Sequence, residues 1–316
     1  MTEFHFAAVV VLTFLVDILL GDPPNRFHPV AWMGNAIGLV RRSAPKSGEV
    51  VRFGWGMALV FGGMVFIGIL GWLIQRACQS CPALVSIFVQ AIVLKCSFSI
   101  SSLAKAAKGV STALRNEDIA AARHQVAYHL VSRDVSKLDE SKLSAATIES
   151  IAENTSDSVI APLFYFAIAG LPGALVYRFV NTCDAMLGYR TAELEWFGKV
   201  AARTDDVLNW LPARITAVLI LLVGGIRNGS FRKATRIWMR DHRLTASPNA
   251  GHPMSAASGV LGVVLEKEGH YVLGASESYP TAATIEQSIR LLWKTSLAGG
   301  LLFIATVSLC GWGQIR

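Results

Sequence analysis

Long apolar stretches constrain this chain more than any other feature of its sequence. Residues 53–74, 84–103 and 291–312 each approach the roughly 20 apolar residues that a helix needs to cross a bilayer. Residues 4–20 form a fourth, slightly shorter stretch that carries Asp17. Charged residues make up only 16% of the chain, against about a quarter in soluble domains. The sequence therefore predicts an integral membrane protein, with the first stretch retained as a membrane helix.

Two further apolar stretches, residues 158–180 and 207–226, are interrupted. The first contains Gly170-Leu171-Pro172-Gly173 in its middle, and the second has Asn209 and Pro212 near its start. Because proline removes a helical hydrogen bond and clashes with the preceding turn, we expect both helices to be broken or re-entrant. The predicted fold is all-α: a polytopic helical membrane protein with four to six membrane-inserted helices, two of them broken or re-entrant.

The cations of the chain lie mostly between the apolar stretches, in residues 21–52, 104–157 and 227–290. Basic loops of this kind are typical of the cytoplasmic side of a membrane protein. The net charge of +7 could also indicate nucleic-acid binding. No basic stripe is interleaved with exposed aromatic residues, so we predict no nucleic-acid partner.

The polar segment 104–157 is expected to be mostly helical. Its Ala, Leu and Val residues recur at helical spacing over 104–115, 119–131 and 142–153, with Asn116 and Asp139 as caps. We therefore predict a single integral membrane domain over residues 1–316, with cytoplasmic helical segments near 104–157 and 227–290.

Three carboxylates share one face of a predicted helix just before the first interrupted stretch. Glu149, Glu153 and Asp157 are spaced four residues apart, so their like charges repel unless water, a cation or a basic partner lies among them. Carboxylates beside a membrane suit Mg²⁺ held together with substrate phosphates. A solvated helix face is the alternative interpretation, but the helix enters an apolar run directly after Asp157.

A second polar group follows the first interrupted stretch. Asn181 and Asp184 lie three residues apart, and Tyr189-Arg190 adds a fork that can pair a phosphate or carboxylate. The acidic residues Glu193, Asp205 and Asp206 follow closely. At the exit of the first helix, Asp22 and His28 form a further polar group. Each of these residues alone could be an ordinary loop residue. Placed between apolar stretches, they are candidates for the wall of a binding pocket.

A third group joins cations to a tight turn. Arg240 and Arg243 precede Ser247-Pro248-Asn249-Ala250-Gly251, whose backbone N–H groups can point into one anion-binding concavity. An unremarkable Pro-Gly turn is the alternative. The chain has no P-loop and no dinucleotide-binding fingerprint, so any nucleotide needs an unfamiliar arrangement.

These polar blocks resemble the adenosylcobinamide-phosphate synthases, the CbiB and CobD membrane proteins of cobalamin biosynthesis. The order and spacing of the blocks hold over nearly the whole chain. One position departs from the pattern, because His252 stands where the family usually has Trp. The matching residues are Leu20-Gly21-Asp22-Pro23 with His28-Pro29-Val30; Glu149-Ser150 with Ala152-Glu153-Asn154; Asn181-Thr182 with Asp184-Ala185-Met186 and Gly188-Tyr189; Asp205-Asp206-Val207-Leu208-Asn209 with Pro212-Ala213-Arg214; and Ser247-Pro248-Asn249-Ala250-Gly251.

The resemblance implies an ATP-dependent amide ligase that joins adenosylcobyric acid to aminopropanol phosphate or ethanolamine phosphate, with ATP and Mg²⁺. It would lie in the inner cell membrane with its site facing the cytoplasm, and its partners would be the corrinoid, the amino-alcohol phosphate, the lipid bilayer and other late enzymes of cobalamin assembly. Glu149, Glu153, Asp157 and Asp184 would be catalytic, the last three of them as metal ligands. The expected substrate- and phosphate-binding residues are Asp22, His28, Asn154, Asn181, Tyr189, Arg190, Arg240, Arg243, Ser247, Asn249 and Gly251.

Two other function classes stay open at the level of sequence. A membrane transporter would carry charged residues inside its spans, as Lys95 does, and an inverted repeat, which is not visible. A non-catalytic AmpE-like membrane regulator would tolerate alanine at Glu153 or Asp184. The sequence leaves open the amino alcohol used, the general base, the number of crossings, the oligomeric state and the role of Cys78 and Cys81.

Overall fold

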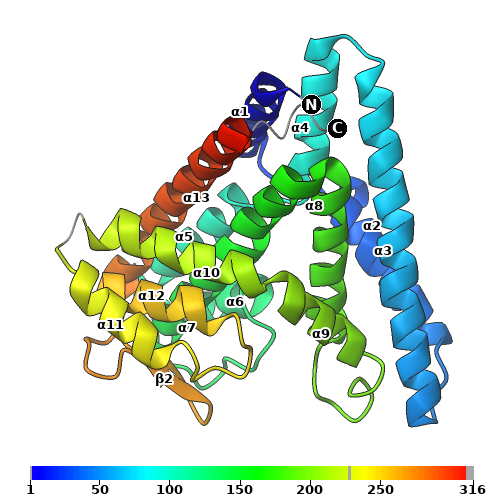
Figure 1. Ribbon diagram of the computed structural model, residues 1–316. Helices are drawn as coiled ribbons and strands as arrows, with labels where there is room; N and C mark the ends of the chain where they lie inside the picture. The colour runs from blue at the N-terminus through cyan, green and yellow to red at the C-terminus, as the bar shows by residue number, and fades with distance from the viewer. Residues whose placement is uncertain (1, 227–228, 311–316) are drawn as a thin grey trace. The chain divides into compact units, whose positions relative to one another are not determined.

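The computed structural model describes residues 2–226 and 229–310, and these fold almost entirely into helices (Figure 1). A short antiparallel hairpin pairs Leu265 with Leu273. The elements are α1 (Glu3–Leu20), the 3₁₀ helix η1 (Asn25–Phe27), α2 (Pro29–Ser43), α3 (Glu49–Gln79), α4 (Ala83–Lys95), α5 (Ser101–Arg115), α6 (Ile119–His129), α7 (Glu140–Thr155), the π-helix η2 (Ser156–Ile160), α8 (Ala161–Leu187), α9 (Lys199–Leu208), α10 (Trp210–Ile220), the π-helix η3 (Leu221–Gly225), α11 (Phe231–Asp241), α12 (Gly251–Leu261), β1 (Leu265–Lys267), β2 (Tyr271–Leu273) and α13 (Ala282–Cys310).

The chain forms two compact units. Unit 1 comprises the described parts of residues 1–99, 161–209 and 302–316, and unit 2 those of residues 100–160 and 210–301. In unit 1, α3 packs along α8, α1 packs on α4, and α2 and α9 also contact α8. In unit 2, α12 packs against α7, α10 and α11, while α5 contacts α6 and α7. That the two units act as one integral membrane domain stays a prediction.

Within residues 2–226 and 229–310, four helical stretches are long and apolar enough to cross a membrane, and the predicted polytopic fold is confirmed in this respect. They are Glu3–Leu20, Glu49–Gln79, Glu140–Leu187 and Ala282–Leu309. The helix predicted over 291–312 begins earlier, at Ala282, and the predicted end at Trp312 lies outside the described residues, as do residues 227–228 of the predicted segment 227–290.

The span predicted over residues 84–103 is wrong. Helix α4 ends at Lys95, and a short turn separates it from α5, which begins at Ser101. The turn forms because Lys95 Nζ donates to the carbonyl of Phe98 at 2.9 Å and pairs with carboxylates. Phe98 is only 2% exposed and packs edge-on against Phe14. Its apolar character therefore serves the protein core and does not extend a membrane helix.

The predicted break in residues 158–180 is confirmed at Gly170. This residue adopts φ 65° and ψ −153°, a conformation that is essentially restricted to glycine. Pro172 follows and offers no N–H, while the N–H of Leu171 donates to Gln75 Oε1 of α3 at 2.9 Å. The side chain of Gln75 thus satisfies a backbone group that the break would otherwise leave unpaired in apolar surroundings.

The second interrupted stretch also breaks as predicted. Helix α9 ends at Leu208 and α10 starts at Trp210, with Asn209 at the break. The two helices reach the length and hydropathy of a span only when they are taken together. In the polar segment 104–157, the predicted helices appear as α5, α6 and α7. Asp139 caps α7 by accepting from the N–H of Lys142 at 2.9 Å, and Asn116 ends α5.

Candidate functional site

A buried carboxylate is the centre of a polar network in unit 1. Asp205 is 9% exposed and accepts from the side-chain amides of Asn209 at 2.9 Å and Asn181 at 3.4 Å. The hydroxyl of Tyr177 donates to Asn209 Oδ1 at 2.8 Å. Because Asp205 lies one helical turn before the break at Asn209, the two side chains share a face of α9. The network joins α8 to α9.

Two further carboxylates lie beside this network. Asp184, in the last turn of α8, interacts electrostatically with both Asp205 and Asp206. Asp206 is near Arg190 and accepts a weak contact from Arg203 at 3.4 Å. Unit 1 therefore places Asp184 and Asn181 beside Asp205, and Arg190 near Asp206. Tyr189 is exposed in the loop after α8.

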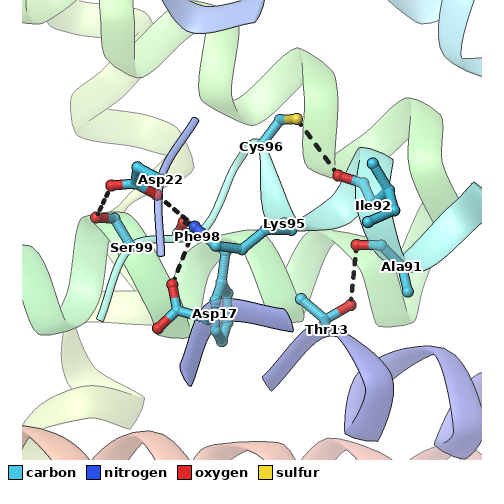
Figure 2. Close-up of polar contacts among 9 residues, drawn as sticks. All are labelled: Thr13, Asp17, Asp22, Ala91, Ile92, Lys95, Cys96, Phe98 and Ser99. Atoms are coloured by element: carbon cyan, nitrogen blue, oxygen red, sulfur yellow. Dashed lines mark hydrogen bonds and ion pairs between the residues drawn. The ribbon is translucent and has the colours of Figure 1, made fainter. Parts of the chain in front are cut away.

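A second polar cluster of unit 1 surrounds Lys95 (Figure 2). Its ammonium lies 3.0 Å from Asp17 Oδ1 and also contacts Asp22 Oδ1, and Ser99 Oγ donates to Asp22 Oδ2 at 2.8 Å. The side chains of Lys95 and Asp17 are only 4% and 1% exposed. The last residue of α4 thereby fixes Asp22, which follows the glycine that ends α1.

His28 connects the two clusters of unit 1. It caps α2 by accepting from the N–H of Val30 at 3.2 Å. Burial lowers the pKa of His28, and the nearby cations Arg178 and Lys95 lower it further, while Asp22 opposes them. Arg178 in turn donates to Asn181 Oδ1 at 3.2 Å. The predicted residues Asp22, His28 and Asn181 therefore lie in one connected polar region.

The predicted carboxylate face of α7 belongs to unit 2. Glu149 is 5% exposed; Arg133 donates to its Oε2 at 3.2 Å, and Tyr271 also interacts with this carboxylate. Glu153 interacts electrostatically with Glu149. Asp157 follows on the π-helix, whose wider turn departs from the four-residue spacing assumed in the prediction. Asn154 donates to the carbonyl of Ser150 at 2.9 Å.

The Ser247–Gly251 block forms the tight turn that the sequence predicts. Ser247 Oγ accepts from the N–H groups of Asn249 at 3.2 Å and Ala250 at 3.3 Å, and α12 begins at Gly251. The buried side chain of Asn249 accepts from Arg214 at 3.3 Å. Arg214 also lies over the ring of Trp210, 4.3 Å from its centroid. A cation thus stands beside the start of α12, where backbone N–H groups favour anions.

His252 occupies an aromatic cluster at this turn. Trp238 Nε1 donates to its Nδ1 at 3.1 Å, and the ring of His242 lies 4.5 Å from its ring, centroid to centroid. Burial lowers the pKa of His252 to about 4, and the cations Arg214 and Arg243 add to this shift. The imidazole is therefore neutral at pH 7 and accepts a hydrogen bond, so an aromatic cluster is kept although the family's usual Trp is absent.

The two predicted arginines of α11 and its following loop differ in their surroundings. Arg240 donates to Asp241 at 2.5 and 2.8 Å, and Asp241 Oδ2 accepts from the N–H of Gly274 at 2.7 Å. Arg243 is exposed and close to His252. Arg240 thus holds a loop through Asp241, and its predicted role in phosphate binding stays a prediction.

Whether these residues fit Mg²⁺ depends on whether the protein alone or the protein together with substrate phosphates holds the ion. Within residues 2–226 and 229–310, no group of three or more His, Cys, Asp or Glu side chains is arranged to bind a metal ion. Mg²⁺ is commonly held by one or two carboxylates together with substrate phosphates, and it keeps several waters. Asp184, with Asp205 and Asp206 beside it, fits the binding of Mg²⁺ together with substrate phosphates.

Several polar residues of these clusters were not among the predicted site residues. Asn209 and Arg214 lie in a block that resembles the family, so their signal was present in the sequence; Asp205 of the same block was a candidate for the pocket wall but had no assigned role. Tyr177, Arg178 and Arg133 lie in no such block, and only their contacts reveal them. Lys95 could be interpreted from sequence only as a charge inside an apolar stretch.

Comparisons with known proteins agree with the resemblance. The family model described as CobD/Cbib protein matches residues 10–292. The cobalamin biosynthesis protein CobD of Dehalococcoides mccartyi is 45% identical over 84% of this chain and 86% of its own length. The probable cobalamin biosynthesis proteins CobD of Methanothermobacter thermautotrophicus and Thermococcus kodakarensis are 37% and 38% identical, covering 94% and 92% of this chain and 98% and 92% of their own lengths. No solved structure matches the chain. Since the family model and these relatives cover most of its length, the chain belongs to the CobD/CbiB protein family.

Proposed function

We propose that this chain is a membrane-embedded ligase of cobalamin biosynthesis. It uses ATP to join the free carboxylate of adenosylcobyric acid to the amine of aminopropanol phosphate or ethanolamine phosphate, which gives adenosylcobinamide phosphate. Membership of the CobD/CbiB family and its cobalamin biosynthesis relatives support the pathway. The chain lies in the inner cell membrane, and its site faces the cytoplasm.

The reaction proceeds in two steps. A carboxylate is a poor electrophile, so its oxygen first takes the γ-phosphoryl group of ATP, releasing ADP and leaving an acyl phosphate. The amine then attacks the carbonyl carbon, inorganic phosphate leaves, and a base takes the proton of the attacking nitrogen. The protein must therefore offer cations for phosphoryl oxygens, donors for a carboxylate and a base.

The observation that carries this proposal is the polar network of unit 1. Asp205, Asn209 and Asn181 come from two family-like blocks and are held by direct hydrogen bonds next to Asp184. A carboxylate that is buried and fixed by two amides, beside a second carboxylate, suits a base whose orientation is set before substrate binds. We assign Asp184 and Asp205 to base and cation roles, and Arg190 to substrate phosphate.

Mg²⁺, when bound with ATP, neutralises charge on the phosphates. In unit 1, Asp184 would hold it with the help of Asp206. In unit 2, the Arg214–Asn249 pair at the start of α12 would meet substrate anions, whereas the buried carboxylate of Glu149 would face a cation or a proton donor. Glu153 and Asp157 keep their predicted metal role as part of this proposal.

The test is reconstitution of the reaction with purified full-length chain in detergent. We expect ATP, Mg²⁺, adenosylcobyric acid and aminopropanol phosphate to yield ADP, phosphate and amide in equal amounts, detected by mass spectrometry. Asp205→Asn should lower kcat about 10²-fold or more, because removal of a positioned base or charge has effects of this size. Glu268→Gln, an exposed residue paired with Lys142, is the matched control and should stay active. Absence of amide from folded wild-type protein contradicts the proposal.

A transporter is the second candidate, and one observation favours it. Lys95 and Asp17 form a buried ion pair against a candidate membrane helix, and such pairs often mark transport pathways. Proteoliposomes incubated with an external corrinoid distinguish the two functions. Uptake without ATP-dependent amide formation would favour transport, whereas amide formation without uptake would favour the ligase.

A further inference from the structure

We propose that unit 1 carries a binding site for the phosphate headgroup of an anionic phospholipid, separate from the candidate reaction site. A cavity of about 680 Å³ lies between the end of α2, the start of α3 and the end of α8 with its following loop. None of the residues expected to be catalytic or to bind substrate lines it. The lining residues are Gly38, Arg41, Arg42, Ala44, Pro45, Lys46, Arg52, Met186, Glu193, Leu194 and Phe197.

The charge of this cavity is strongly positive. Arg41, Arg42, Lys46 and Arg52 line it, and Glu193 is the one acidic residue among the lining residues. Arg41 donates to Glu193 Oε1 at 3.2 and 2.7 Å, so this pair is largely self-neutralised. The hydrogen bond from Arg41 lowers the pKa of Glu193, which keeps the pair ionised. Arg42, Lys46 and Arg52 remain for an external anion, and Arg52 also makes a long contact of 3.5 Å to the carbonyl of Ala192.

The rest of the cavity is apolar, which distinguishes its ligand from a small soluble anion. Leu194 and Phe197 are 6% and 2% exposed and form a fixed base, and Met186 joins them. Next to the cations, α3 begins with Val50 and Val51, which are 84% and 51% exposed. A ligand with a phosphate and hydrocarbon chains can satisfy both surfaces.

The position along the chain supports a lipid as the occupant. Helix α3 is the 31-residue candidate span Glu49–Gln79, and only 17% of its apolar window is buried in the protein. Lys46 and Arg52 flank its first residue, which is where lipid phosphates lie at the end of a membrane helix. Basic pockets at this depth bind anionic headgroups, with about 1 kcal/mol for each cation near the surface.

The experiment titrates purified full-length protein with three probes: dioleoyl phosphatidylglycerol, dioleoyl phosphatidylcholine and inorganic phosphate. Native mass spectrometry reports how much of each is bound. We expect phosphatidylglycerol to bind at least tenfold more tightly than phosphatidylcholine, and the Arg42→Gln/Arg52→Gln double variant to weaken it about 25-fold, roughly fivefold for each charge. Arg76→Gln, which removes an exposed cation from the other end of α3, should leave binding unchanged.

Glu193→Gln should change phosphatidylglycerol binding in the opposite direction. It removes the acidic residue and releases Arg41, so phosphatidylglycerol should bind several-fold more tightly. Equal binding of phosphatidylglycerol by wild type, the double variant and Glu193→Gln would overturn the proposal. Displacement of phosphatidylglycerol by millimolar inorganic phosphate would assign the cavity to a soluble phosphate and would overturn it too. Ligase activity is not part of the readout, so the outcome is independent of the proposed reaction.

Discussion

Replacing Lys95 by methionine should destabilise unit 1 strongly. Methionine keeps the length and apolar stem of the side chain but removes the ammonium that lies 3.0 Å from Asp17 and contacts Asp22 (Figure 2). Asp22 is 22% exposed and keeps its bond from Ser99, so it can stay hydrated. Asp17 is only 1% exposed and would lose the cation that compensates for its burial.

The expected cost follows from this difference. Leaving one member of a buried ion pair without its partner costs about 3–5 kcal/mol, whereas replacing both members by apolar residues is often neutral. Against a typical stability of about 5–15 kcal/mol, the single change removes a large fraction. Lys95→Met/Asp17→Leu should therefore recover at least half of the loss.

Denaturation of the purified protein in detergent, followed by tryptophan fluorescence, measures both variants. A loss of about 4 kcal/mol lowers the ratio of folded to unfolded protein roughly a thousandfold. Lys105→Met is the control, because Lys105 is exposed on α5. A loss below about 1 kcal/mol for Lys95→Met, or a double variant no more stable than the single one, would refute the reasoning.

Two further predictions concern backbone strain and pH. Gly170→Ala should destabilise the protein by about 1–3 kcal/mol, because φ 65° with ψ −153° disfavours any side chain. Gly62→Ala is the control and should be neutral or slightly stabilising, because an added Cβ there meets open space. Equal stability of both variants in the same denaturation assay would contradict this. The pKa of His252 falls from 6.5 in the unfolded chain to about 4, so between these values the unfolded state binds more protons and stability should decrease as pH falls from about 6.5 to 4. His252→Gln should flatten that part of the stability curve, and an unchanged slope would show that other groups cause it.

The helical, membrane-inserted character of the chain could be predicted because it depends on local signals. Apolar length, the Gly170–Pro172 break and the cap at Asp139 each act within a few residues. The end of α4 could not be predicted, since it depends on Lys95 meeting Asp17 and Asp22, which are more than 70 residues away in sequence. Hydropathy alone does not distinguish a buried Phe98 from a lipid-facing one.

Part of the candidate site could also be predicted from the sequence. Family-like blocks pointed to Asp184, Asn181 and Asp22, and unit 1 places them in one polar region through Arg178 and His28. Sequence spacing treated Glu149, Glu153 and Asp157 as one face of a regular helix. The π-helix that begins at Ser156 changes the position of Asp157 relative to the two glutamates, and no residue pattern predicts this π-helix.

The central claim is that this chain activates a carboxylate by phosphoryl transfer. Adenosylcobyric acid labelled with ¹⁸O in its free carboxylate tests it directly, with mass analysis of the phosphate released by wild-type protein in the presence of ATP, Mg²⁺ and aminopropanol phosphate. We predict one ¹⁸O atom in each inorganic phosphate for every amide formed. Label that stays out of the phosphate, or appears in AMP, would contradict the account.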